Sequence, residues 1–318
     1  MAEHIQQQVD VPDELSGQRL DQIAAQLFDR YSRSRLQSWI KSGELTVNGT
    51  QKRARDKLVS GDVLCLDAQT EDEQRWEAET LALDIVHEDD DILVINKPAG
   101  LVVHPAAGNP AGTLLNAILS HYPAGASIPR AGIVHRLDKD TSGLMVVAKT
   151  LAAQNHLVDQ LQSRTVHREY EAVVIGTMTG GGTVNAGIGR HPRQRKKMAV
   201  LHHGGKEAIT HYRLIKRFGH HTHIRCLLET GRTHQIRVHM AHIHHPLIGD
   251  PAYGGRPRLP RAASDVLIET LRGFPRQALH ARRLSLIHPR SDEENGWEVS
   301  LPDDIKGLLA VLATEDPA

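Results

Sequence analysis

A dense polar stretch, residues 135–143 (HRLDKDTSG), runs directly into an apolar segment, residues 144–148 (LMVVA). The residues before it, 131–134 (AGIV), have the composition of a strand, and the apolar segment is too short for a helix to be the first expectation. Loops held by rigid strands are where catalytic groups concentrate. Asp and Ser in turns also cap backbone N–H groups. The residues alone therefore indicate either a catalytic loop or a polar turn.

The chain has 318 residues and a formal net charge of +0. This length predicts about two domains and a substantial core, and the charge means that affinity for nucleic acid must come from local patches. Cys65 and Cys226 both lie in apolar, strand-like runs, which argues against a disulfide framework. No segment resembles a signal peptide or a membrane span. We therefore expect a soluble cytoplasmic protein that does not associate with membranes.

Charge is segregated along the N-terminal third of the chain. Residues 30–57 carry eight Lys or Arg against two acids, whereas residues 67–91 carry eleven acids against one arginine. A run of like charge is usually a solvated surface, and the acidic stretch is typical of a linker between domains.

The basic segment has a more organised pattern. Ser32 is placed to cap a helix that ends at Gly43, and Asn48-Gly49 is a strong signal for a hairpin, with residues 63–66 as a further strand. Such a unit suits a phosphate backbone or the shape of folded RNA. The alternative is a small basic domain that binds protein or nothing. The candidate RNA-binding residues are Arg33, Arg35, Lys41, Arg53, Arg55 and Lys57.

Residues 168–174 alternate between two faces, with Tyr170 on the apolar face and two glutamates on the other. This pattern predicts a half-buried strand with Tyr170 pointing inward, where a structural tyrosine is the ordinary interpretation. A basic, glycine-bounded loop follows at residues 190–197. It is typical of a loop that clamps RNA, or of one that only solubilises the chain. Its candidate contacts are Arg190, Arg193, Arg195, Lys196 and Lys197.

Residues 228–239 (LETGRTHQIRVH) predict the end of a strand, a break at Gly231 and a helix capped by Thr233. Arg237 lies at the border of the apolar face of that helix, so its guanidinium can reach into a cleft. Twelve of the 21 histidines fall between residues 191 and 245. We do not expect a metal there, because the region has no HExxH pattern and no zinc-type cysteine pair.

Several of these segments together resemble the RluA-type pseudouridine synthases. They are residues 91–100 (DILVINKPAG), 135–143, 168–174, 228–239, 277–281 (QALHA) and 287–289 (IHP). The order of motifs in the N-terminal unit resembles an S4 RNA-binding domain. The resemblance implies that Asp138 is the catalytic carboxylate, that Tyr170 faces the target base and that Arg237 is the partner of Asp138. Arg232 is a weaker candidate for that last role, and spacing alone does not separate the two arginines.

The resemblance implies an α+β fold, in which a mixed, largely antiparallel sheet with flanking helices carries a central cleft. The expected domains are an N-terminal tail (1–15), an S4-like domain (16–67), an acidic linker (68–80) and a catalytic domain (81–318). We expect Lys97 to belong to the wall of the cleft and not to the chemistry. We expect Asp138 and Arg237 to lie within about 4 Å of each other, as in a close ion pair.

The chemistry that the resemblance implies is conversion of uridine to pseudouridine in RNA. The bond from ribose C1′ to uracil N1 breaks, and C1′ is joined to C5 instead. No electron is transferred, so we expect no redox or other cofactor. An ionised Asp138 can either add to C1′ or remove a ribose proton, and the sequence does not choose between these steps.

The wording of the motifs and the S4-like domain most resemble the group of this family that acts on large-subunit (23S) ribosomal RNA, in the stem-loop called helix 69. The expected partner is therefore that rRNA or a pre-ribosomal particle, bound by a monomer. Two alternatives remain open. One is a noncatalytic ribosome-assembly factor that binds RNA, and the other is a carboxylate-based hydrolase with Asp140 as its second acid.

Overall fold

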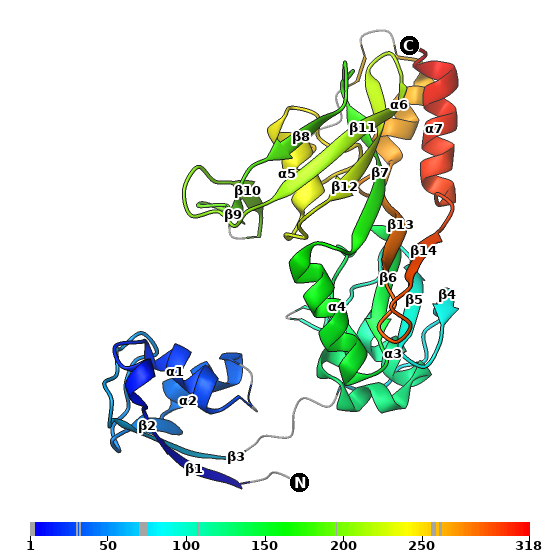
Figure 1. Ribbon diagram of the computed structural model, residues 1–318. Coiled ribbons are helices and arrows are strands. Elements are labelled where there is room, and N and C mark those ends of the chain that lie inside the picture. The colour runs from blue at the N-terminus through cyan, green and yellow to red at the C-terminus, as the bar shows by residue number, and fades with distance from the viewer. Residues whose placement is uncertain are drawn as a thin grey trace. The chain divides into compact units, whose positions relative to one another are not determined.

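The computed structural model describes residues 4–29, 31, 33–69, 76–106, 108–194, 196–255, 259–260 and 263–318. The chain divides into two compact units, Met1–Arg75 and Trp76–Ala318, and each is considered by itself (Figure 1). Within the described residues, no helix has both the length and the apolar character needed to cross a membrane.

The N-terminal unit is a three-stranded sheet with two helices. Residues 1–15 were expected to be a tail, but His4–Asp10 form strand β1. The backbone of β1 pairs with β3 along its whole length. The sheet order is β1-β3-β2, and the strands and helices share one hydrophobic core. The other elements are α1 (Leu20–Leu27), α2 (Arg33–Ser42), β2 (Leu45–Val47) and β3 (Val63–Gln69).

The expected helix and turn of the basic segment are both present in this unit. Helix α2 ends at Ser42, and Gly43 follows with a φ of +90°, a conformation that favours glycine. The cap expected at Ser32 lies outside the described residues. Asn48 and Gly49 form the predicted tight turn with φ values of 50° and 71°, and β2 then pairs with the distant β3.

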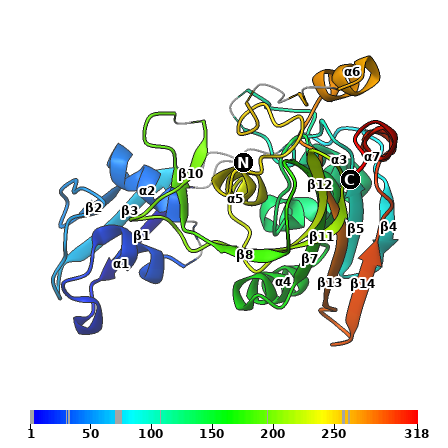
Figure 2. The same cartoon turned by 90° about the horizontal axis from the view of Figure 1, so that it is seen from above.

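The second unit is built on a nine-stranded mixed sheet, as the sequence analysis expected. Its order is β4-β5-β6-β13-β7-β12-β11-β8, with β14 paired to β13 (Figures 1 and 2). The β6–β13 pairing is parallel and the other pairings are antiparallel. Its strands are β4 (Ile85–Glu88), β5 (Ile92–Lys97), β6 (Ser142–Ala148), β7 (His167–Ile175), β8 (Gly182–Asn185), β11 (Ile209–Arg217), β12 (His221–Leu228), β13 (Leu279–Ile287) and β14 (Glu294–Glu298).

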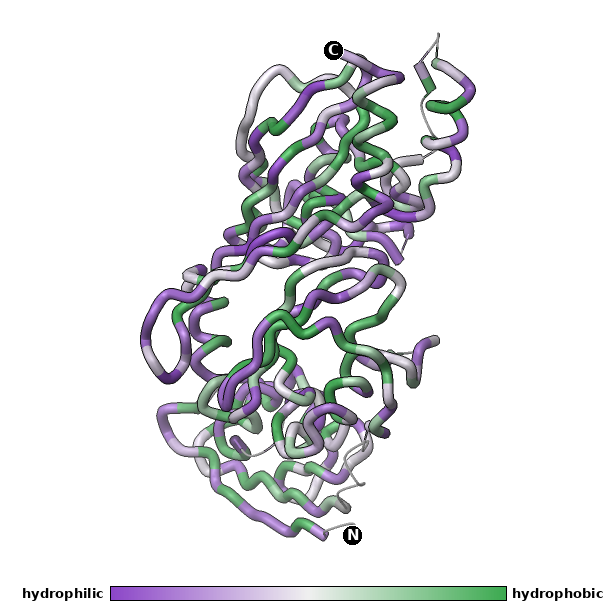
Figure 3. The backbone as a smooth tube through the Cα atoms, turned by 90° about the vertical axis from the view of Figure 1, so that its right-hand side faces the viewer, coloured by the Kyte–Doolittle hydropathy of each residue, from purple (hydrophilic) through white to green (hydrophobic). Residues whose placement is uncertain are grey.

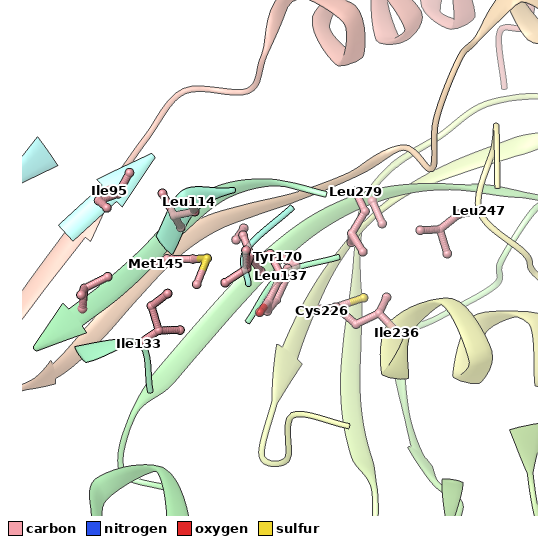
Figure 4. Packing of buried hydrophobic residues seen from close by; sticks show 14 of the residues in the cluster. Ile95, Leu114, Ile133, Leu137, Met145, Tyr170, Cys226, Ile236, Leu247 and Leu279 are labelled. Carbon is pink, nitrogen blue, oxygen red and sulfur yellow. The ribbon is translucent and has the colours of Figure 1, made fainter. Parts of the chain in front are cut away.

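Helices cover both faces of this sheet. On one face, α3 (Leu114–His121) and α5 (Gln235–His242) share a core with Met145, Tyr170 and their neighbours (Figure 4). On the other, α4 (Leu151–Ser163), α6 (Asp265–Gly273) and α7 (Asp303–Glu315) pack against the strands. Strands β5 and β6 carry buried apolar residues on both sides. Figure 3 shows apolar and polar stretches following one another along the backbone.

A small hairpin, β9 (Ile188–Arg190) and β10 (Met198–Val200), carries the basic loop. The strand expected at residues 131–134 is wrong. Pro129–Gly132 forms a 3-10 turn instead, in which Arg130 and Ala131 have φ values of 55° and 50°. The turn brings Gly132 so close to β6 that a Cβ atom there would lie 1.8 Å from the backbone oxygen of Ala148. Close packing on β6 therefore overrides the local preference for a strand.

Candidate active site

The loop that carries Asp138 connects this 3-10 turn to β6, and its backbone is fixed from several sides. The buried ammonium of Lys97 donates to the carbonyl of Lys139 at 3.0 Å, and the guanidinium of Arg276 donates to the carbonyl of Asp140 at 3.1 Å. Gly143 has a φ of +113°, and a Cβ atom there would lie 2.2 Å from the Ala281 oxygen. The loop is therefore held rigidly at the start of β6.

Lys97 was expected to be part of the cleft wall, but it is not among the residues that line the cavity of Asp138. Its side chain is fully buried, and Nζ also donates to the carbonyls of Pro98 and Leu101 at 2.7 and 2.9 Å. Burial lowers the pKa of Lys97 to about 8, although the charge of Asp140 acts in the opposite direction. Lys97 thus ties the turn after β5 to the loop of Asp138.

Asp138 and Arg237 meet as the sequence analysis expected. Arg237 Nη1 donates to Asp138 Oδ2 at 2.8 Å. The other edge of the same guanidinium donates two hydrogen bonds to Asp250, from Nε to Oδ2 at 2.7 Å and from Nη2 to Oδ1 at 2.9 Å. A two-pronged contact of this kind fixes the plane of the guanidinium. Asp250 therefore aims Arg237 at Asp138.

The electrostatics of this cluster favour full ionisation of Arg237 and Asp250. Burial alone would lower the pKa of Arg237, but hydrogen bonds and charges from Asp250 and Asp138 outweigh it and raise that pKa. Burial alone would raise the pKa of Asp250, but Arg237 and the backbone N–H groups of Tyr253 and Ala252 lower it. The two side chains therefore form a buried ion pair, and a further N–H group of Arg237, on Nη1, is directed at Asp138.

Arg232, the weaker candidate, is not the partner of Asp138. Its Nε donates to the backbone oxygen of Glu207 at 2.9 Å. The expected cap by Thr233 is also wrong, because α5 begins at Gln235 and His234 precedes it with a φ of 58°. The side chain of Gln235 folds back instead and accepts a hydrogen bond from the backbone N–H of Arg232 at 2.9 Å.

Tyr170 lies on β7, on the face that the alternating pattern predicted. The residue is 6% exposed and belongs to the same hydrophobic core as Leu137. Burial raises the pKa of its hydroxyl; Arg168 opposes this rise, and Asp138 adds to it. The phenol is therefore neutral at ordinary pH. It lines the same cavity as Asp138.

Asp138, Tyr170 and Arg237 line one cleft of about 830 Å³ in the second unit. Its walls come from the loop of Asp138, from β7, from α4 and from the segment that joins β12 to α5. The volume suits a nucleotide-sized group in the interior, because ligand pockets commonly measure about 300–1,000 Å³.

A second acid poised beside Asp138 would favour glycoside hydrolysis, and Asp140 was the candidate for it. Asp140 is not among the residues that line the cleft. Glu229 does line it, but its carboxylate is bonded to His211 at 2.6 Å and to Arg164 at 3.1 Å. Neither acid is therefore placed as a free proton donor next to Asp138.

The candidate RNA-binding residues belong to both units. In the N-terminal unit five of the six are exposed, while Arg35 is half-buried against the ring of Trp39. In the β9–β10 hairpin, Arg190 at the end of β9 is exposed, as are Arg193 and Lys196 in the loop, and Lys197 is half-buried. Arg195 lies outside the described residues. Their role in binding RNA stays a prediction.

Sequence reasoning missed Asp250, His234 and Tyr253 as parts of the site. His234 Nε2 lies 3.8 Å from Asp138 Oδ1, and its Nδ1 lies 2.8 Å from the hydroxyl of Tyr253. That hydroxyl also accepts a hydrogen bond from the backbone N–H of Met198 in β10. Asp250 lies 13 residues after Arg237, beyond the helix, so no periodic pattern links the two.

Among the described residues, one group of three side chains has spacing that suits a metal ion: Asp89, Asp91 and His288. It does not line the cleft, and its carboxylates already bind protein groups. Asp89 accepts from the backbone N–H of Ile92 at 2.8 Å, and Asp91 lies 2.5 Å from Arg290 Nε. We assign no metal to it.

Comparisons with known proteins agree with this geometry. The family described as RNA pseudouridylate synthase matches residues 91–242. The chain is 60% identical over 318 residues to ribosomal large subunit pseudouridine synthase D of Pseudomonas aeruginosa, covering 100% of this chain and 99% of the relative. It is 55% identical over 316 residues to the protein of the same name from Escherichia coli strain K12, covering 99% and 97%.

A solved structure, human RNA pseudouridylate synthase domain containing 4, is similar with a TM-score of 0.56 and 26% identity, covering 74% of this chain and 94% of that one. The structure of human RNA pseudouridylate synthase domain containing 1, at 24% identity and a TM-score of 0.54, shows the same fold. On its full-length identity to these bacterial relatives, the chain belongs to the RluA-type family of pseudouridine synthases.

Proposed function

We propose that this protein converts uridines of large-subunit (23S) ribosomal RNA to pseudouridine. The family assignment supports the reaction, and the names of the two bacterial relatives, similar over almost the whole chain, support the substrate. The observation that carries the proposal is the Asp138–Arg237 contact of 2.8 Å inside a cleft that Tyr170 also lines.

The reaction is an isomerisation, so its atoms must balance without a second substrate. The N1–C1′ bond breaks, the uracil turns, C5 bonds to C1′, C5 loses its proton and N1 gains one. The target base must leave its stack to enter such a cleft. Water must be kept away from C1′, since it would otherwise add to that carbon and leave uracil as a free base.

Asp138 is the group we assign to the sugar. Positive charge develops at C1′ when the glycosidic bond breaks, and a nearby carboxylate stabilises that charge or adds to the carbon. Arg237 donates a hydrogen bond to the Asp138 carboxylate at 2.8 Å and fixes its direction. Tyr170, which is buried and has a neutral hydroxyl at the cavity, supports the uracil or assists the removal of the C5 proton.

The finer assignment is that the modified uridines lie in helix 69, that the protein acts as a monomer and that it meets the rRNA alone or within a pre-ribosomal particle. The basic residues of the N-terminal unit and of the β9–β10 loop supply the charge needed to hold folded RNA.

The test is a map of pseudouridines in total rRNA from cells with and without this gene. We expect the loss of a small set of sites in large-subunit rRNA, confined to helix 69, and their return with the wild-type gene. Unchanged large-subunit rRNA in the deletion strain would contradict the proposal. Restoration by an Asp138→Asn gene would favour a noncatalytic assembly factor instead.

A further inference from the structure

Arg168 is a buried arginine in the cleft for which neither the site geometry nor the comparisons give a role. It lies on β7 two residues before Tyr170, so both side chains belong to the same face of the strand. It is 8% exposed and lines the same cavity as Asp138.

Arg168 differs from the other buried arginines in having no partner. Three arginines are buried within the described part of the chain. Arg237 binds Asp250 and Asp138, and Arg276 binds Asp304 through two hydrogen bonds. The side chain of Arg168 makes no hydrogen bond or ion pair to any described residue, and its Nε is buried without an acceptor. A buried cation without a counter-charge is strongly unfavourable.

The carboxylates of the cleft do not compensate this charge. Asp138 is bonded to Arg237, and Glu229 is bonded to Arg164 and His211. Exposed cleft arginines such as Arg136 are solvated and need no partner. The charge of Arg168 also acts on its surroundings, since it adds to the effect of burial in lowering the pKa of His135.

The space around the guanidinium is shaped to hold it in place. A Cβ atom at Gly231 would lie 2.6 Å from Arg168 Nη1, so the absence of a side chain at Gly231 is what leaves room for the guanidinium. Gly231 lies in the segment between β12 and α5 that forms one wall of the cleft.

We propose that Arg168 is a phosphate-binding residue, which takes its missing counter-charge from a backbone phosphate next to the target uridine. A guanidinium matches the geometry of phosphate oxygens and binds them through paired hydrogen bonds. Residues two apart on a strand are roughly 7 Å apart, a spacing that a nucleotide with its base at Tyr170 and its phosphate at Arg168 can bridge. This proposal rests on the proposed function in one respect, which is that the ligand is RNA.

The first experiment measures binding of the full-length protein to a large-subunit rRNA transcript over a range of salt concentrations. Loss of one phosphate contact should lower the slope of log affinity against log salt by roughly 0.7–0.9 in Arg168→Met. Arg168→Lys should keep the slope. Gly231→Ala, which displaces the guanidinium but keeps the charge, should weaken binding less than Arg168→Met. The matched control is Arg225→Met, because Arg225 is ion-paired with Glu169 and does not line the cleft.

The second experiment replaces either phosphate beside the target uridine with an uncharged methylphosphonate in a synthetic rRNA fragment. One of the two replacements should weaken binding to the wild-type protein about tenfold and should have little further effect on Arg168→Met. Equal effects on both proteins would show that another residue holds that phosphate, and an unchanged salt slope would point to a contact of Arg168 with the uracil oxygens. Either result would overturn the proposal.

Thermal unfolding without RNA separates this role from a structural one. Arg168→Met removes an unpaired buried charge, so the variant should unfold at the wild-type temperature or above it. A drop of many degrees would overturn the proposal.

The binding experiments do not depend on product formation, so they test the phosphate contact separately from the proposed function. If Arg168→Met lowers the salt slope but the wild-type protein forms no pseudouridine, only the proposed function is contradicted. If the wild-type protein forms pseudouridine but Arg168→Met leaves the slope unchanged, only the phosphate contact is contradicted.

Discussion

Arg237 Nη1 lies 2.8 Å from Oδ2 of Asp138, although 99 residues separate them in the sequence. The contact places the arginine of α5 against the loop before β6, and the buried carboxylate of Asp250 holds the other edge of the same guanidinium. Arg237 therefore has two functions. Its guanidinium compensates the buried charge of Asp250, and it orients the carboxylate of Asp138 at the cleft.

Arg237→Met should abolish activity and also destabilise the protein, because it leaves Asp250 buried without its partner. Breaking a buried ion pair from one side costs about 3–5 kcal/mol. The double variant Arg237→Met/Asp250→Asn removes both charges, and the amide oxygen that it introduces at position 250 can still accept the backbone N–H groups. We expect urea unfolding to show recovered stability and rate measurements to show no recovered activity.

Arg237→Lys provides the control for geometry. Lysine keeps the charge but cannot contact Asp250 with two prongs and Asp138 with a third N–H group. Activity should therefore stay well below that of the wild type. Full activity in this variant would show that the charge alone is sufficient.

Tyr170→Phe should separate the ring from the hydroxyl. The ring is packed in the core, whereas the hydroxyl makes no hydrogen bond to any described residue. Stability and half-saturating enzyme concentration should therefore stay near wild type. The single-turnover rate should fall by about 100-fold or more if the hydroxyl takes part in proton transfer. An unchanged rate would restrict Tyr170 to supporting the uracil.

Deletion of residues 1–75 should weaken binding to structured rRNA and leave the cleft intact. The deleted residues coincide with the N-terminal compact unit. Each lost phosphate contact should lower the slope of log affinity against log salt by roughly 0.9 or less. A truncated protein with the slope of the full chain would show that the basic segment does not touch the RNA backbone.

His135 should make the free energy of unfolding of the second unit depend on pH. Its Nε2 accepts a hydrogen bond from the backbone N–H of Val146 at 3.0 Å. Burial, with a further contribution from Arg168, lowers its pKa from 6.5 to about 3. Below pH 6.5 the unfolded chain binds a proton that the folded chain does not. The free energy of unfolding is therefore not reduced by His135 above pH 6.5, and it falls as the pH drops from 6.5 toward about 3.

His135→Gln tests this dependence, because its amide oxygen can still accept the hydrogen bond but does not titrate. Urea unfolding at about pH 7 and about pH 5 should show the wild type losing stability relative to the variant at the lower pH. An equal loss in both proteins would assign the effect to other histidines.

Much of the site could be predicted because its parts follow short local patterns. The alternation around Tyr170 gave the correct face of a strand, and the apolar run after residue 143 gave β6. The contact between Arg237 and Asp138 was implied by the resemblance to the RluA-type synthases, because helix position alone did not separate Arg237 from Arg232. The mixed, largely antiparallel sheet also agrees with the expectation from the sequence.

The rest depends on packing between segments that are distant in sequence. Residues 131–134 have the composition of a strand, but contact with β6 forces Arg130 and Ala131 into left-handed conformations. Thr233 has the chemistry of a cap, but no described side chain caps α5, and the side chain of Gln235 binds the backbone N–H of Arg232 before the helix. Asp250 and Arg168 show their roles only when their partners, or the absence of partners, are known in three dimensions.

The central claim is that Asp138 is the catalytic carboxylate. The most direct measurement is pseudouridine formation in large-subunit rRNA by purified wild-type, Asp138→Asn and Asp140→Asn proteins, with RNA binding and thermal unfolding measured on the same preparations. Asp140 is the matched control, because it lies two residues away and does not line the cleft. We expect Asp138→Asn to bind rRNA and fold normally but form no pseudouridine, and Asp140→Asn to remain active. Wild-type rates in Asp138→Asn would contradict the account.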